Sequence, residues 1–278
     1  SLIGRPEVVQ NRVERLGLNF RPGEDCEIIN PQDDPRYRDY WTLYHTLAER
    51  SGVSPDEART RVRTNATVIA ALAVMRGDAD AMICGSEGRY DQHLCHIQDI
   101  IGFQAGVREM SAVSVLILSK GTFFLTDTYV TPDPTAEAVA EMTVLAAEEV
   151  RRFGIEPRVA LLSHSNFGSS NSASARKMRQ AREIVTQLDP TLQVEGEMHG
   201  DAAVDPEIRA HIFPNSLLEG QANLLVMPDQ DAANIAFNLL KTLADGLAVG
   251  PILVGAARSA HIVTPSVTAR GLLNMCAV

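Results

Sequence analysis

Short apolar runs alternate with longer amphipathic stretches along most of the chain. Six of the apolar runs have the length and composition of strands, and they span 26–30, 81–84, 112–118, 158–163, 223–227 and 251–255. Amphipathic segments with helical spacing lie between them. This alternation is typical of an α/β fold, in which layers of helices cover sheets.

Two segments carry the residues that favour the first turn of a helix. Ser54, Pro55 and Glu57 combine an N-cap hydroxyl, a proline at the first helical position and a capping-box glutamate. Asp133 and Pro134 predict the start of a second helix in the same way.

Two amphipathic stretches predict helices with one buried face. Apolar side chains recur at helical spacing after Pro134 and again after the run at 223–227, which predicts that both faces pack in the core. The first face comprises Val139, Met142, Ala146, Val150 and Phe153, and the second comprises Ile235, Leu239 and Leu243.

Composition narrows the class of protein. A chain of 278 residues with 45% hydrophobic content can bury the core of one large domain or of two packed ones. The 35 acidic and 25 basic residues give a net charge of -10, which opposes non-specific binding to nucleic acid. We therefore expect no nucleic-acid partner.

Cysteine spacing and hydropathy indicate a compartment. The four cysteines lie far apart with no C-x-x-C pair, so neither a zinc site nor a disulfide framework is predicted, and a reducing cytoplasm is favoured. The longest apolar run, 66–75, is too short to span a bilayer, and no signal peptide is recognisable, so we expect no membrane partner. The chain begins without Met, and we interpret it as a piece of a longer polypeptide.

Standard cofactor and metal motifs are absent from the sequence. There is no G-x-G-x-x-G after a strand and no G-x-x-x-x-G-K-[ST]. His93 and His96 share a helical face, but no Cys, His or carboxylate accompanies them at metal-binding spacing. A surface or helix-packing pair is therefore favoured over a metal site.

The segment 161–175 reads LLSHSNFGSSNSASA and is followed at once by RKMR. An apolar strand that passes into serines, an asparagine and a glycine, and then into a basic helix, is a pattern that binds phosphate. In open α/β sheets, ligands bind beyond the carboxyl ends of strands, where this loop falls. From the residues alone, a phosphate-binding loop and an ordinary serine-rich loop with an N-cap remain equally open.

The loop resembles the Ser-x-Ser-Thr-x-Gly-Ser segment of the phosphate acetyltransferase family, with Asn166 at the threonine position. Four further segments resemble motifs of that family in the same order, namely GEMHGDAA at 196–203, MPDQDAANI at 227–235, GPILVGAA at 250–257 and TPSVTARG at 264–271. Five ordered matches are far more specific than one. Over 1–278 the chain is similar to a narrower group, the C-terminal phosphotransacetylase-like domain of bacterial hybrid malic enzymes.

The resemblance implies a fold and a division of the chain. We expect two three-layer α/β/α lobes with a ligand cleft between them. Residues 1–107 plus 252–278 would form the first lobe, and residues 108–251 the second.

The resemblance also implies that catalytic groups are missing. In active members a serine is assigned to charge stabilisation, the next residue, an arginine, to phosphate binding, and an aspartate to removal of the coenzyme A thiol proton. These positions hold Ala269, Arg270 and Cys276. Loss of an oxyanion-stabilising donor costs about 10² to 10³ in rate, and loss of a general base about 10² to 10⁴. Thr268 points about 100° away from position 269 on a helix, and Cys276 is expected to be buried, so we expect no catalytic residues here.

A second departure lies at 89–102, RYDQHLCHIQDIIG, where active members carry Thr-Arg-Ala-Asp-Thr followed by an arginine that aligns with Cys95. Arg89 is close enough in sequence to replace that anion-binding group. A solvated residue at the start of a helix is an equal alternative for Arg89.

The resemblance therefore implies a regulatory acetyl-CoA-binding and oligomerisation domain of an NADP-dependent malic enzyme, which oxidatively decarboxylates malate to pyruvate. NADP and a divalent metal would bind in a malic enzyme domain outside these residues, and this domain would hold no cofactor of its own and would form at least a homodimer. An active phosphate acetyltransferase and a ligand-free dimerisation module are the alternatives. The residues expected to bind acetyl-CoA or phosphate are Ser163, Asn166, Gly168, Ser169, Ser170, Asn234 and Arg270.

Overall fold

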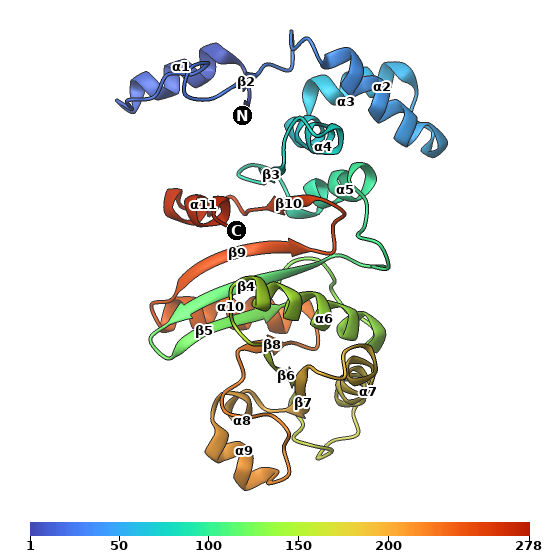
Figure 1. The fold of residues 1–278 in the computed structure, drawn as a ribbon, viewed down its shortest axis with the longest axis vertical. Helices are drawn as coiled ribbons and strands as arrows, with labels where there is room; N and C mark the ends of the chain where they lie inside the picture. The colour runs from blue at the N-terminus through green and yellow to red at the C-terminus, as the bar shows by residue number, and fades with distance from the viewer. The chain divides into compact units, whose positions relative to one another are not determined.

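A computed structural model describes residues 1–278 and divides them into two compact units. Unit 1 comprises Ser1–Gly102 and Ala256–Ala260, and unit 2 comprises Phe103–Gly255 and His261–Val278 (Figure 1). None of the helices combines the length and the apolar content needed to span a bilayer.

Unit 1 is mainly helical. Its helices are α1 (Pro6–Arg15), α2 (Tyr37–Ala48), α3 (Pro55–Thr64), α4 (Ala66–Arg76) and α5 (Tyr90–Ile100), with a 3-10 turn at Glu49–Ser51. Strands β1 (Leu2–Ile3) and β2 (Ile28–Ile29) pair in parallel, and β3 (Ala81–Cys84) follows α4. Helix α4 is apolar almost all round, and seven of its side chains are buried, so it forms the centre of this unit.

Unit 2 is built on a six-stranded mixed sheet in the order β7-β6-β8-β5-β4-β9. Strands β5, β6, β7 and β8 run parallel, while β4 is antiparallel to both of its neighbours. The strands are β4 (Ser111–Leu118), β5 (Gly121–Thr126), β6 (Arg158–Leu162), β7 (Gln193–Met198), β8 (Leu224–Val226) and β9 (Leu247–Val254). Strand β10 (Ser259–Ile262) divides between the two units.

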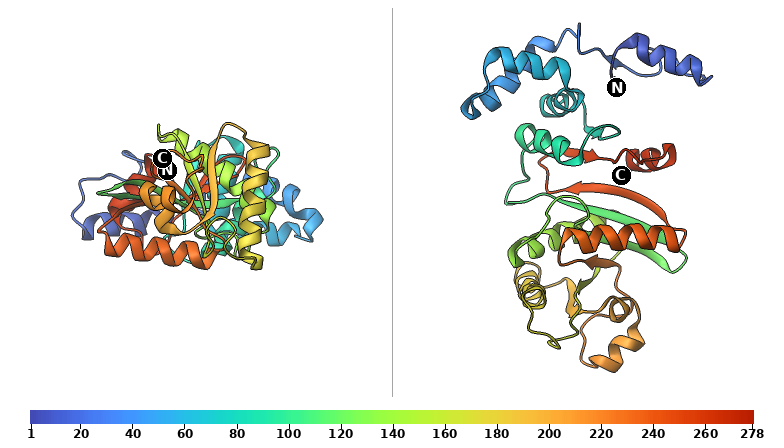
Figure 2. Two further views of the ribbon diagram at one scale, coloured as in Figure 1. Left: turned by 90° about the horizontal axis from the view of Figure 1, so that it is seen from below. Right: turned by 180° about the vertical axis from the view of Figure 1, so that it is seen from behind.

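Helices cover both faces of this sheet. Helices α6 (Ala136–Arg152) and α7 (Ala173–Leu188) pack together on one face, and α8 (Gly200–Val204) and α10 (Gln230–Leu243) contribute to a core on the other. Helix α6 lies in front of the sheet in Figure 1, and α10 lies in front of it when seen from behind (Figure 2). Helices α9 (Pro206–Ile212) and α11 (Ala269–Cys276) follow α8 and β10, and α11 packs against β9.

The α/β class is thus confirmed, and each of the six predicted apolar runs overlaps a strand. Strands β1, β5, β7 and β10 were not predicted. Strand β7 reads QVEGEM, and its two buried glutamates interrupt the apolar run by which the other strands were recognised.

One predicted helix start is confirmed and the other is wrong by two residues. Ser54 Oγ accepts the Glu57 N–H over 3.2 Å, as expected. Helix α6 begins at Ala136, because Thr135 is the N-cap, and its hydroxyl accepts the Ala138 N–H over 3.2 Å. The carboxylate of Asp133 instead forms an ion pair with Lys177 at 2.8 Å.

The two predicted buried faces differ in outcome. On α6 the first four positions, Val139, Met142, Ala146 and Val150, are at most 3% exposed, and Phe153 is 37% exposed at the C-cap. On α10 the prediction is wrong, since the exposed fractions of Ile235, Leu239 and Leu243 are 58%, 55% and 80%. Helix α10 instead buries Ala233 and Phe237 in the core on this face of the sheet.

The compact units differ from the expected lobes in the closing segment. The first boundary, after Gly102, lies close to the expected one at 107. Residues 261–278, expected with the first lobe, group with unit 2, where α11 packs against β9. The lobe division of 1–107 plus 252–278 and 108–251 stays a prediction.

Candidate functional site

The carboxyl ends of β5, β6, β7 and β8 meet at one edge of the sheet in unit 2. The loop after β6, residues 163–172, carries five of the seven candidate residues: Ser163, Asn166, Gly168, Ser169 and Ser170. Asn234 lies in α10, which follows β8, and Arg270 lies in α11. Ligands of open parallel sheets bind at such an edge, so the loop was placed correctly by the sequence.

The path of the 163–172 loop is set by two residues in left-handed conformation. Phe167 has φ of 46° and Gly168 has φ of 90°. The unusual conformation of Phe167 is supported by its ring, which stacks on Phe213 with ring centroids 4.4 Å apart. The loop ends where Ser172 Oγ accepts the Ala175 N–H over 3.2 Å and caps α7.

A buried carboxylate occupies the inner side of this loop. The side chain of Glu197, from β7, is 0% exposed. Its Oε1 accepts hydrogen bonds from Ser165 Oγ at 2.6 Å, Gly168 N at 3.0 Å and Arg179 Nη1 at 2.6 Å. Its backbone oxygen accepts the Phe167 N–H over 2.8 Å. The loop is therefore built around an anion that belongs to the protein.

The serines of the loop also bond to one another. Ser165 Oγ accepts the Ser170 N–H over 3.0 Å and lies 3.3 Å from Ser169 Oγ. Ser169 Oγ accepts the Asn166 N–H over 2.9 Å, and Ser163 Oγ accepts the Ser165 N–H over 3.1 Å. Most backbone donors from 163 to 170 are thus used within the protein, because short polar side chains readily bond to nearby backbone.

The basic residues of α7 are likewise engaged within the chain. Arg179 bonds to Glu197, and Lys177 pairs with Asp133. Arg176 donates to the backbone oxygen of Asn171. The RKMR segment therefore stabilises the loop and the start of α7, rather than presenting unpaired cations.

A smaller set of neutral donors remains for a ligand on the outer side. The Asn166 Oδ1 accepts the His199 N–H over 2.7 Å, which leaves the Nδ2 of Asn166 as a donor without a partner in the protein. Gly168 and Ser169 are exposed, and Ser163 and Ser170 are half-buried. The first N–H groups of α7, at 173 and 174, also lack intrahelical partners. This arrangement suits an anion bound by dipoles.

Asn234 contacts the loop that follows β5. Its Nδ2 donates to the backbone oxygen of Thr128 over 3.2 Å, and it bonds to the side chain of Tyr129, whose pKa is raised by burial. That loop is held by the buried carboxylate of Asp127, which accepts backbone N–H groups from 129, 130 and 131. Burial raises the pKa of Asp127.

Arg270, the one cation among the candidate residues of unit 2, forms no ion pair. It is exposed in the first turn of α11 and has no hydrogen bond or ion pair in the structure. No hydrogen bond joins it to the 163–172 loop. Thr268 Oγ1 accepts the Gly271 N–H over 3.0 Å and so caps α11.

The two replaced catalytic positions, Ala269 and Cys276, are seven residues apart in α11, and such residues share a helical face. That face carries a methyl group and a thiol. The expected burial of Cys276 is wrong, because this side chain is exposed near the end of the chain.

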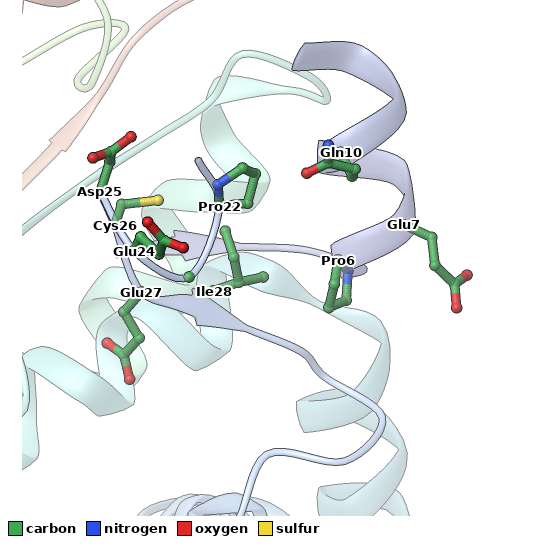
Figure 3. A pocket seen from close by; sticks show the side chains of 10 residues that line it. Pro6, Glu7, Gln10, Pro22, Glu24, Asp25, Cys26, Glu27 and Ile28 are labelled. Carbon is green, nitrogen blue, oxygen red and sulfur yellow. The ribbon is translucent and has the colours of Figure 1, made fainter. Parts of the chain in front are cut away.

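Unit 1 holds no candidate binding residue except Arg89, which is exposed and pairs with Asp91 at 2.6 Å. His93 bonds to Thr67 on α4 and His96 bonds to Asn65, the N-cap of α4, as expected of a helix-packing pair. An open hollow of about 930 Å³ lies beside α1 and β2 and is lined by Glu7, Glu24, Asp25 and Glu27 among others (Figure 3). These carboxylates oppose binding of a phosphate there.

The contacts that join Ser165, Arg179 and Glu197 were not predicted from the sequence. Ser165 and Glu197 both lie inside motifs recognised from the sequence. Nothing in one sequence shows that strands β6 and β7 are adjacent, so the contact between these motifs was not predicted.

Comparison with known proteins gives a consistent result. A model described as phosphate acetyl/butaryl transferase matches residues 1–278. The chain is 56% identical over 277 residues to an NAD-dependent malic enzyme of Rhizobium meliloti and 49% identical over 278 residues to an NADP-dependent malic enzyme of Escherichia coli. Each match covers 100% of this chain but only 36% and 37% of those enzymes, so the chain spans about a third of their length. A phosphotransacetylase structure from Streptococcus pyogenes superposes with a TM-score of 0.87 at 30% identity, covering 99% of this chain and 82% of that one.

Proposed function

Because this chain belongs to the phosphate acetyl/butaryl transferase family, we propose that it is a regulatory acetyl-CoA-binding domain of an NADP-dependent malic enzyme. Its similarity to part of two malic enzymes supports this parentage. The nicotinamide nucleotide and a divalent metal would bind in the rest of that polypeptide, in the cytoplasm. The malic enzymes that the chain is similar to include both an NAD-dependent and an NADP-dependent one, so the choice of NADP for the parent enzyme is part of the proposal.

The observation that carries the proposal is the face of α11 with Ala269 and Cys276. The resemblance implies a charge-stabilising serine and a basic aspartate at these two positions. A methyl group donates no hydrogen bond to a developing oxyanion, and this loss alone costs about 10² to 10³ in rate. Because the thiol at position 276 is exposed, slow acyl transfer is the rival function, and phosphate acetyltransferase activity must be measured.

Binding is supported by the groups that the chain retains. Arg270 and the neutral donors of the 163–172 loop suit the phosphates of coenzyme A, since charge-assisted hydrogen bonds from a guanidinium to phosphate are stronger than hydrogen bonds between neutral groups. Acetyl-CoA would regulate the parent enzyme by binding one arrangement of the domain more tightly than another.

Self-association is supported by the exposed face of α10. Ile235, Leu239 and Leu243 form an apolar stripe over two turns of a 14-residue helix. A two-fold axis would bury the same stripe on both copies, so a second copy of this chain is the proposed occupant. Leu239→Asp should shift the sedimentation velocity from dimer to monomer. Leu188→Asp, at a position on α7 that is 58% exposed, is the matched control and should leave the dimer intact.

The deciding experiment has two arms on the isolated chain. Titration calorimetry with acetyl-CoA should give saturable binding, and incubation with acetyl phosphate and coenzyme A should give no turnover above background. Turnover within a few-fold of an active family member would favour the phosphate acetyltransferase instead. No heat at millimolar acetyl-CoA would favour a ligand-free dimerisation module. In the full-length chain, acetyl-CoA should change malate oxidation only while this domain is present.

A further inference from the structure

We propose that Glu197 is the positioning residue of the 163–172 loop. Its buried carboxylate is an internal anion that holds the loop in the conformation in which the remaining donors, on the outer side of the loop, face a ligand. The proposal rests on the contacts of the carboxylate. It is fully buried, and its Oε1 alone accepts hydrogen bonds from Ser165, Gly168 and Arg179. The loop and the start of α7 therefore share one acceptor atom.

The second carboxylate oxygen makes the arrangement unusual. Oε2 of Glu197 is buried and has no hydrogen-bond partner in the structure. A buried polar atom without a partner costs free energy. This cost is offset where the other oxygen organises a whole segment, and every hydrogen bond of the Glu197 carboxylate goes to the loop or to α7.

The arrangement also neutralises two basic side chains of α7. The guanidinium of Arg179 is neutralised by Glu197 at 2.6 Å, and Lys177 is neutralised by Asp133 at 2.8 Å. The inner side of the loop is therefore closed to an external anion, which would meet the buried carboxylate. A phosphate must bind on the outer side, at Asn166 Nδ2, the exposed Ser169 and the first turn of α7. Gly168 N would not contact the ligand, because it already donates to Glu197.

A matched control lies two residues away on the same strand. Glu195 is also buried in β7 and accepts a backbone N–H, that of Leu217, over 3.0 Å. It makes no hydrogen bond to the 163–172 loop. Substitution of Glu195 and of Glu197 should therefore destabilise the same strand, while only the latter should release the loop.

The test is amide hydrogen exchange of the loop in the isolated chain. Glu197→Ala should raise exchange across 165–170 at least about tenfold, because buried donors lose their acceptor. Glu197→Gln keeps an oxygen for Ser165 and Gly168 and should stay within about threefold of the wild type. Glu195→Ala should leave loop exchange within about threefold of the wild type. Equal loop exchange in Glu197→Ala and Glu195→Ala would overturn the proposal, as would unchanged exchange in Glu197→Ala.

Two further measurements keep the test decisive. Circular dichroism shows whether Glu197→Ala folds. If it does not fold, Ser165→Ala is measured in its place. A rise in loop exchange of less than about twofold in Ser165→Ala would overturn the proposal. A ligand arm, which rests on the proposed function, measures acetyl-CoA affinity, and Glu197→Ala should weaken binding at least about tenfold while Glu197→Gln retains most of it. Failure of the wild type to bind acetyl-CoA would count against the proposed function and leave the exchange result standing.

Discussion

Lowering the pH should destabilise unit 2 through one histidine, His261 of β10. Burial lowers the pKa of His261 to about 4, and the charge of Arg152 adds to this effect. The Leu253 N–H donates to His261 Nδ1 over 3.3 Å, which requires that this nitrogen carry no proton. The native state therefore holds His261 neutral.

The sign and size of the effect follow from the two protonation states. In the unfolded chain the pKa of this side chain returns to 6.5, so the unfolded state takes up a proton as the pH falls through 6.5, whereas the native state does so only near 4. Stability is complete above the first value and is lost across this window. From about pH 8 to about pH 5 the loss is about 2 kcal/mol, since each pH unit inside the window contributes about 1.4 kcal/mol.

Urea denaturation at the two pH values measures this loss. His261→Gln keeps an acceptor for Leu253 but does not titrate, so its free energy of unfolding should fall about 2 kcal/mol less than that of the wild type. The buried carboxyls of Asp127 and Glu149, whose pKa values burial raises, titrate in both proteins and cancel in the difference. His211→Gln, which removes an exposed imidazole, is the control. Equal losses in wild type and His261→Gln would refute the reasoning.

Three further predictions concern the loop region and the helix ends. Gly196→Ala should cost about 3 kcal/mol in urea denaturation, because the new Cβ would lie 2.6 Å from the Leu161 oxygen at φ of 139°, whereas Gly200→Ala, with nothing within 4 Å, should be nearly neutral. Thr135→Ala should lower the free energy of unfolding by about 1 kcal/mol through loss of the α6 cap. Arg270→Ala should weaken acetyl-CoA binding about tenfold by calorimetry, and unchanged affinity would remove Arg270 from the site.

Much of the architecture was predictable because it depends on local chemistry. Apolar runs flanked by polar residues identified strands such as β4 and β6, and Ser54 with Pro55 identified the start of α3. The 163–172 loop was identified because a strand that passes into serines and glycine before a basic helix predicts a polar loop at the carboxyl end of that strand, although the residues alone left its role open between phosphate binding and helix capping. The identity of Ala269 and Cys276, which carries the proposed loss of catalysis, is likewise a property of the sequence alone.

Other features depend on which segments meet in space. The stripe of Ile235, Leu239 and Leu243 has the spacing of a core face, yet the face with Phe237 is buried, since periodicity defines a face without saying what it meets. Glu197 illustrates the same limit at the site. No strand was predicted around Glu197, and only the pairing of β6 with β7 brings its carboxylate to Ser165, Gly168 and Arg179. The sequence by itself thus determined the donors of the loop, and the tertiary structure decided which of them remain free, because a donor's partner is set by contacts between distant segments.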